Sequence, residues 1–205
     1  MPLLDQTAGF SQVNVMKGSA NQAATAGACH NFSLEWLAAM YADASPANAA
    51  ARMRALGKNK GGAAMVTQTV FSNEWTRQSA AAADKGVAAW RGLQFVRDII
   101  PYAAYTEASF LAGLNGTDVA GLIYSFWFTG SVAGAGGGAH TIAFFRKMKT
   151  GRGTTGKADN QVFAFDPNFG ECLIVEGGLP AWVTDMLSQY GPCNAHWMRG
   201  FRTIA

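Results

Sequence analysis

The run VAGLIYSFWF at residues 119–128 is followed, after a glycine-rich segment, by the run AHTIAFFRK at residues 139–147. Both runs are rich in aromatic and β-branched residues, which favour strands, and the glycines between them favour a turn. No Asp, Glu, Lys or Arg occurs from residue 119 to residue 145, so length alone would permit a transmembrane helix. The central glycines argue against a membrane span, and the sequence predicts a strand–turn–strand unit.

The rest of the chain divides around this unit. Residues 1–26 are small and polar and are expected to be irregular. Helices are predicted at residues 29–42, 46–60, 64–83, 86–99, 107–115 and 180–190, and further strands at residues 161–166, 171–175 and 196–204. Helices first and strands later predict an α+β fold with an antiparallel sheet. We expect residues 1–205 to form a single domain, because this length suits one domain of ordinary size.

The composition excludes several classes of protein. Hydrophobic residues make up 49% of the 205 residues, which excludes general disorder. The formal charge of +3 is spread without long runs, whereas nucleic-acid binding needs a basic stripe. The chain has three cysteines, Cys29, Cys172 and Cys193. Three are too few for a disulfide framework, and an odd number cannot all be paired. A reducing compartment at the site of action fits this cysteine content better than a secreted, bridged domain does.

Three residues from distant parts of the chain carry the expected chemistry. Cys29, in GACHNFS at residues 27–33, stands where a helix is predicted to begin, and free N–H groups and the helix dipole stabilise a thiolate there. His140 follows the glycine-rich turn, and Asp166 ends the next strand. If these strands pair, His140 and Asp166 can be cross-strand neighbours. A thiolate, an imidazole that moves protons and a carboxylate that orients it are the groups needed for covalent acyl transfer.

These motifs resemble a known family. The pattern Gly27-x-Cys29-x-x-Phe32-Ser33 is similar to the segment around a papain-like nucleophile. The stretch FDPNFGE at residues 165–171, after a strand histidine, looks like the YopT-type cysteine proteases, which are bacterial effectors delivered into eukaryotic cells. The resemblance implies a papain-like fold, with the nucleophile helix packed on a C-terminal antiparallel sheet. One departure is His30, which stands where many papain-like enzymes have Trp.

The resemblance also implies a role for each site residue. Cys29 would be the nucleophile, His140 the general base and acid, and Asp166 the residue that orients the imidazole. An oxyanion hole would combine the backbone N–H of Cys29 with an upstream side-chain amide, for which Gln22 is preferred and Asn21 is the alternative.

Two further residues are expected to contact substrate. Gly138 closes the glycine cluster just before the histidine strand, where a residue without a side chain allows close approach. Trp182 stands late in the chain and is expected to line the substrate cleft.

The sequence therefore predicts a cysteine protease of the bacterial effector or toxin type that needs no cofactor. A zinc site is disfavoured, since Cys193-x-x-His196 has no second pair at matching spacing. The same triad also serves glutamine deamidases, transglutaminases and acyltransferases, and a catalytically inactive binding module is a further alternative.

Expectations about partners and location follow from this function. The expected partners are a protein substrate in a host or target cell and a chaperone or immunity protein, with no nucleic acid and no transmembrane segment. The chain is expected to be a monomer. We expect synthesis in the bacterial cytoplasm, secretion without a cleavable signal peptide, and delivery into the cytosol of the host or target cell.

Overall fold

The computed structural model describes residues 4–17, 28–77, 79–129, 137–148, 158–175 and 177–204. Within them a seven-stranded sheet has the order β1-β6-β5-β4-β3-β7-β2, and all neighbouring strands are antiparallel. The strands are β1 (Gln6–Gly9), β2 (Leu93–Ala104), β3 (Gly121–Phe128), β4 (Gly138–Met148), β5 (Ala158–Asp166), β6 (Gly170–Ile174) and β7 (Cys193–Thr203).

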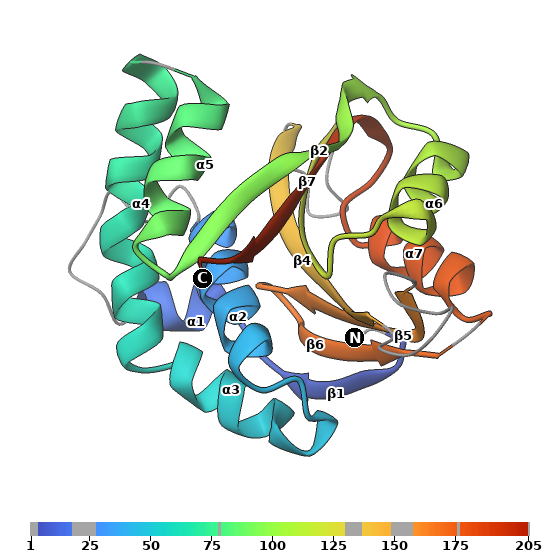
Figure 1. Cartoon of the computed structure of the whole chain (residues 1–205), viewed down its shortest axis with the longest axis horizontal. Helices are drawn as coiled ribbons and strands as arrows, with labels where there is room; N and C mark the ends of the chain where they lie inside the picture. Colours follow the sequence, from blue (N-terminus) through green and yellow to red (C-terminus); the bar gives the residue numbers. More distant parts are fainter. Residues whose placement is uncertain are drawn as a thin grey trace.

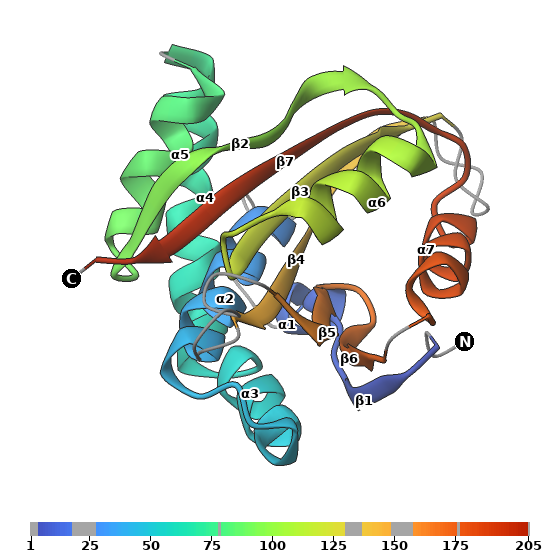
Figure 2. The same ribbon diagram turned by 45° about the vertical axis from the view of Figure 1, so that its right-hand side comes forward.

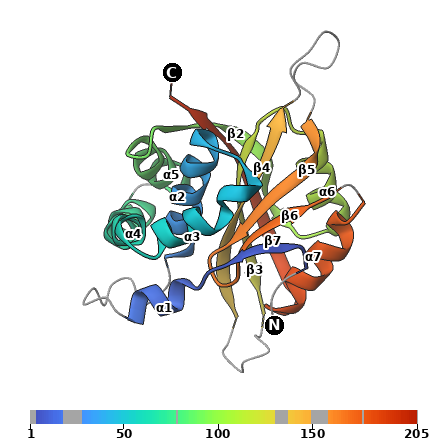
Figure 3. The ribbon, with the colours of Figure 1, turned by 90° about the horizontal axis from the view of Figure 1, so that it is seen from below.

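Helices cover both faces of this sheet (Figure 1). They are α1 (Gln12–Lys17), α2 (Cys29–Ala42), α3 (Ala49–Leu56), α4 (Asn59–Arg77), α5 (Ala80–Ala89), α6 (Glu107–Gly116) and α7 (Leu179–Ser188), with a short 3-10 helix at Pro46–Asn48. Helices α2 to α5 lie on one side of the sheet and α6 and α7 on the other, as the turned views show (Figures 2 and 3). None of the helices in the described ranges is long and apolar enough to cross a membrane.

The side chains of β4 alternate between two buried clusters. Ala143 and Phe145 pack in the cluster beneath α2 to α5, whereas Ile142 and Phe144 pack in the cluster beneath α6 and α7. This alternation is the expected consequence of a strand buried on both faces. It assigns His140 to the α7 side of the sheet.

The predicted fold class is confirmed, because the structure is α+β with an antiparallel sheet. The strand–turn–strand unit corresponds to β3 and β4, which pair from Gly121 with Phe145 to Phe128 with Gly138. The predicted helix at residues 29–42 has the bounds of α2. The core of the fold therefore lies where the long apolar runs placed it.

The helix predicted at residues 86–99 is wrong from residue 90 onward. Helix α5 ends at Ala89, Gly92 turns the chain with a positive φ of 68°, and β2 then pairs with β7. Three irregularities in that pairing interrupt the alternation of side chains, so the strand has no clear period of two in the sequence. Pro101 is tolerated because β2 is an edge strand.

The N-terminal segment is more ordered than predicted. Residues 1–26 were expected to be irregular, but β1 pairs with β6 and α1 follows it. The two elements are only four and six residues long, so their own sequence carries little periodic signal. Pairing with β6, which is distant in sequence, is what orders this segment.

Candidate active site

Cys29 is the first residue of α2 and its side chain is partly exposed. The residue before it, Ala28, occupies the N-cap position without a side-chain hydrogen bond to the helix. The N–H groups of the first helical turn have no acceptor within the helix, and the helix dipole is positive at this end. The position therefore favours the thiolate over the thiol.

His140 and Asp166 come from the paired strands β4 and β5. His140 lies near the start of β4, and Asp166 is the last residue of β5. The His140 Nε2 atom lies 2.9 Å from Asp166 Oδ1, and both side chains are buried. This hydrogen bond occupies Nε2 and leaves Nδ1 as the ring nitrogen available to the thiol of Cys29.

Asp166 is held by two further donors. The backbone N–H of Asn168 donates to Oδ1 over 2.8 Å, and the hydroxyl of Tyr190 donates to Oδ2 over 2.7 Å. The ring of Tyr190 also stacks on the ring of His140, with centroids 4.7 Å apart and planes at 25°. Asp166 and Tyr190 together fix both the position and the plane of the imidazole.

The electrostatics of Cys29 and His140 favour a thiolate–imidazolium pair. Burial alone would raise the pKa of Cys29, but hydrogen bonding and charge from His140, with smaller contributions from Thr141, lower it below its ordinary value. Burial alone would lower the pKa of His140, but the charge and hydrogen bond of Asp166, together with Cys29, raise it to about 10. Both shifts favour the state in which the proton resides on the imidazole and the sulfur is a thiolate.

The other two cysteines have the opposite character. Burial raises the pKa of Cys172 to about 12 and that of Cys193 to about 11. No histidine contributes to the pKa of either thiol. Cys29 is therefore distinguished from them by its surroundings and not by residue type.

The residues predicted to bind substrate have different positions. Gly138 is exposed at the start of β4, two residues before His140. Trp182 is fully buried and packs edge-on against Phe144, with ring centroids 5.7 Å apart. The interpretation of Trp182 as a cleft residue is wrong, because α7 turns this side chain into the core. Asn21 and Gln22, the predicted oxyanion-hole residues, lie outside the described residues.

Sequence reasoning missed three polar residues around Cys29, His140 and Asp166. Tyr190 and Asn168 hold Asp166, and Gln12 lies against the same turn, with its backbone N–H donating to Pro167 over 2.6 Å. Asn168 stands within the stretch that carried the family resemblance and could have been noticed there. Tyr190 and Gln12 come from segments without any motif, so only the fold brings them to the site.

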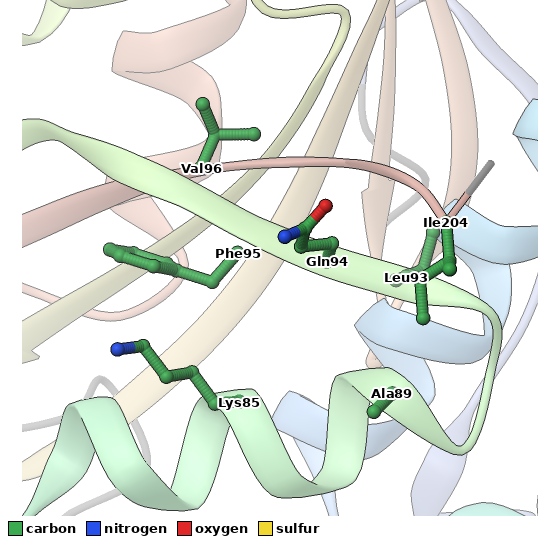
Figure 4. A pocket seen from close by; sticks show the side chains of 7 residues that line it. All are labelled: Lys85, Ala89, Leu93, Gln94, Phe95, Val96 and Ile204. Carbon is green, nitrogen blue, oxygen red and sulfur yellow. The ribbon is translucent and has the colours of Figure 1, made fainter.

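Among the described residues, His196, the acidic and metal-ligating side chains, and the hollow between α5 and β2 were the other candidates for a reactive site, and each lacks the groups that a reaction needs. His196 is fully buried and contacts Ser109 and Tyr124 through its two ring nitrogens. In the described part of the chain, no group of three or more His, Cys, Asp or Glu side chains is arranged to hold a metal. A hollow of about 560 Å³ between α5 and β2 is lined by residues such as Lys85 and Phe95, and no cysteine, histidine or carboxylate lines it (Figure 4).

Comparison with known proteins supports the architecture. No protein-family model matches the chain, and no curated protein matches its sequence. Among solved structures, the chain is similar to the Pseudomonas avirulence protein AvrPphB, with a TM-score of 0.52 and 16% sequence identity. The similarity covers 91% of this chain and 99% of the chain of AvrPphB. The two proteins therefore share a fold over nearly their whole lengths.

Proposed function

We propose that this protein is a cysteine protease of the bacterial effector type, with Cys29 as nucleophile, His140 as general acid and base, and Asp166 as the orienting carboxylate. The observation that carries the proposal is the arrangement of these three groups, with a hydrogen-bonded His140–Asp166 pair and a Cys29 whose pKa is lowered by His140. The resemblance to YopT-type proteases and the shared fold with an avirulence protein support the effector role.

The geometry suits a two-step hydrolysis. The thiolate of Cys29 attacks the carbonyl carbon of a peptide bond, and the developing oxyanion is stabilised by the backbone N–H of Cys29 and an upstream amide. The imidazolium of His140 gives its proton to the departing amine, which leaves an acyl-enzyme on Cys29. His140 then takes a proton from water and the hydroxide attacks the thioester. Collapse of the adduct releases the acid product and restores the Cys29 thiolate beside the His140 imidazolium.

The remaining expectations belong to this proposal. Gly138 would let an extended substrate approach beside His140, and Gln22 or Asn21 would supply the second oxyanion donor. The substrate would be a protein of a host or target cell, reached by secretion and delivery into that cell's cytosol. A chaperone or immunity protein would be a further partner of the monomeric enzyme.

The first test is the rate of iodoacetamide labelling at each cysteine as a function of pH. Cys29 is expected to react well below the pKa of about 8.5 of a free thiol, and His140→Ala is expected to move its profile toward that value. Cys172 and Cys193 are internal controls, since their pKa values are raised to about 12 and about 11. A wild-type Cys29 that reacts like an ordinary thiol would contradict the proposal.

The second test separates proteolysis from related reactions of the same triad. A host-cell lysate is incubated with wild-type protein and with Cys29→Ala, and new protein amino termini and released ammonia are both measured. New termini produced only by the wild type identify a protease. Ammonia without new termini would identify a glutamine deamidase or transglutaminase instead.

A further inference from the structure

The N-terminal segment of β1 and α1 lies against the turn that follows Asp166. The N–H of Phe10 donates to the carbonyl of Phe169 over 2.9 Å, and the side chain of Gln6 donates to the same carbonyl. Figure 3 shows β1 running beside β6 and leading to α1 on the side of the sheet where α2 and α4 lie. The segment therefore spans from the turn of Asp166 to the helix layer that contains Cys29.

One side chain of this segment makes the connection directly. The Oε1 atom of Gln12 accepts the backbone N–H of Ala28 over 3.2 Å, and its Nε2 donates to Oδ1 of Asn168 over 2.8 Å. Gln12 is only 4% exposed; its hydrogen bond to Ala28 is buried, and its hydrogen bond to Asn168 is partly buried. Asn168 in turn donates its backbone N–H to Asp166 and its side-chain amide to the hydroxyl of Tyr190.

The bond to Ala28 replaces a helix cap that the local sequence lacks. In a capping box, a Glu or Gln in the first turn of the helix reaches back to the N–H of the N-cap residue. Here the third helical residue is Asn31, whose side chain is directed to Gln68 and Thr67 of α4. Gln12 supplies the missing acceptor from a different element, just before Cys29.

We propose that Gln12 is a positioning residue that ties the N-terminus of α2 to the turn of Asp166, so that Cys29 and His140 are held at the spacing their ion pair requires. The inference rests on the proposed function, because it assumes that Cys29 is an activated nucleophile. Gln12 contacts neither reacting group and acts through Ala28 on one side and Asn168 on the other. Small losses of alignment at such a pair have large effects on the thiolate population.

The experiment measures the pH profile of Cys29 alkylation by iodoacetamide in Gln12→Met, which keeps the volume of the side chain and removes both hydrogen bonds. Near pH 6.5 the rate is expected to fall roughly threefold to tenfold, with the profile moving toward that of a free thiol. The matched control is Gln6→Met, which removes a glutamine bonded to Phe169 but not to Ala28 or Asn168. The control is expected to keep the wild-type profile.

A second variant keeps the test decisive if Gln12→Met does not fold. Asn168→Ala breaks the same connection from the side of the turn and leaves Gln12 on Ala28. Because Asn168 also donates to the hydroxyl of Tyr190, the variant is compared in the Tyr190→Phe background, where that bond is already absent. Its profile is expected to shift in the same direction relative to Tyr190→Phe alone. Thermal unfolding of each variant is measured alongside, because a merely structural role would lower the melting temperature without moving the pH profile.

The outcomes distinguish this inference from the proposed function. An activated wild-type Cys29 with an unchanged profile in the folded variants would overturn the role of Gln12 and leave the triad standing. An equal shift in Gln6→Met would also overturn it, since the effect would then belong to the whole segment. A wild-type Cys29 that behaves as an ordinary thiol would overturn the proposed function, and the positioning role with it.

Discussion

Within the described residues there are two buried His–Asp pairs with nearly the same hydrogen-bond length. His140 Nε2 lies 2.9 Å from Asp166, and His30 Nε2 lies 2.8 Å from Asp84. Both histidines are under 5% exposed and both carboxylates are fully buried. The first pair lies on the α7 side of the sheet, whereas the second lies among α2, α5 and β7. Cys29 is the chain neighbour of His30, but its thiol pairs with His140.

The two pairs differ in the charges that surround them. Arg199 binds Asp84 from the other side, and burial, Arg199 and Arg91 together lower the pKa of His30 in spite of Asp84. At His140 the third group is the thiol of Cys29, which helps Asp166 to raise the pKa to about 10. The lowered pKa favours a neutral His30 near pH 7, whereas the raised pKa favours a charged His140. A short His–Asp hydrogen bond does not by itself identify a catalytic pair, because the surrounding charge sets the protonation state.

The largest effects are expected when each carboxylate is removed by itself. One removal should mainly change the reactivity of Cys29, and the other should mainly change the stability of the fold. In Asp166→Ala, the His140 imidazolium can lose its proton, so the main expected effect is on Cys29. Once the pKa of the thiol exceeds 6.5, its alkylation rate near pH 6.5 should fall about tenfold for each further unit by which that pKa rises. In Asp84→Ala, the fully buried guanidinium of Arg199 cannot lose its proton. That variant should lose about 3–5 kcal/mol of unfolding free energy.

Urea unfolding and pH-dependent alkylation are measured for both variants. Asp166→Ala should mainly lower the alkylation rate of Cys29, and Asp84→Ala should mainly lower the free energy of unfolding. Asp166→Asn is the graded control, because an amide oxygen still accepts the hydrogen bond of His140 but carries no charge, and its alkylation rate should lie between those of wild type and Asp166→Ala. If Asp84→Ala moved the Cys29 profile as far as Asp166→Ala does in the folded protein, the distinction between the two pairs would be wrong.

The sequence predicted those parts of the fold that long apolar runs determine. The run at residues 119–128 and its partner at residues 139–147 became β3 and β4, and the stripe at residues 29–42 became α2. Strand β2 was missed because its bulged pairing with β7 hides the alternation of side chains. Strand β1 was missed because its four residues are ordered by β6 and not by their own composition.

The candidate site was predictable where a motif and a topology coincided. Cys29 at a helix start, His140 after a turn and Asp166 before a proline each had a local signature, and pairing of β4 with β5 brings the last two together. Trp182 had no such signature, and its side chain is buried. The sequence marks His30 only as a departure from the family pattern, because its partner Asp84 and the Arg199 that binds Asp84 are distant in the sequence.

The pH dependence of stability should sharpen the comparison, with a smaller effect. Because the folded-state pKa of His30 is lowered, its contribution to stability is present above the unfolded value of about 6.5 and is lost as the pH falls below it. Wild type should therefore lose unfolding free energy between pH 7.5 and pH 5, and His30→Gln should show a smaller loss between these two values.

His140→Gln is the matched control for that measurement. The pKa of His140 is raised, so its own contribution is fully present below about 6.5 and is lost as the pH rises toward about 10. The acid-induced loss of stability should therefore persist in His140→Gln. Urea unfolding at pH 7.5 and pH 5 gives the change in unfolding free energy for each variant. A change in His30→Gln as large as that in wild type would contradict the lowered pKa of His30.

The smallest expected effect concerns Tyr190, whose ring stacks on the His140 of the first pair as another aromatic ring stacks on the His30 of the second. His140 stacks on Tyr190, and His30 stacks on Phe71 with ring centroids 4.1 Å apart. Only Tyr190 adds a hydroxyl, which donates to Asp166. Tyr190→Phe keeps the stacking ring and removes that hydrogen bond. Since such a bond contributes about 1 kcal/mol, the Cys29 alkylation rate near pH 6.5 should fall roughly twofold to tenfold.

Tyr190→Leu distinguishes the two parts of this contact, because it removes both the ring and the hydroxyl. If the plane of the imidazole matters as well as the charge of Asp166, alkylation in Tyr190→Leu should fall further than in Tyr190→Phe. Equal rates in the two variants would show that the hydroxyl alone acts on the site. A Tyr190→Phe profile identical to that of wild type would show that Asn168 and His140 suffice to hold Asp166. The stacked ring would then have the same packing role at both histidines, and the charge environment alone would separate the two pairs.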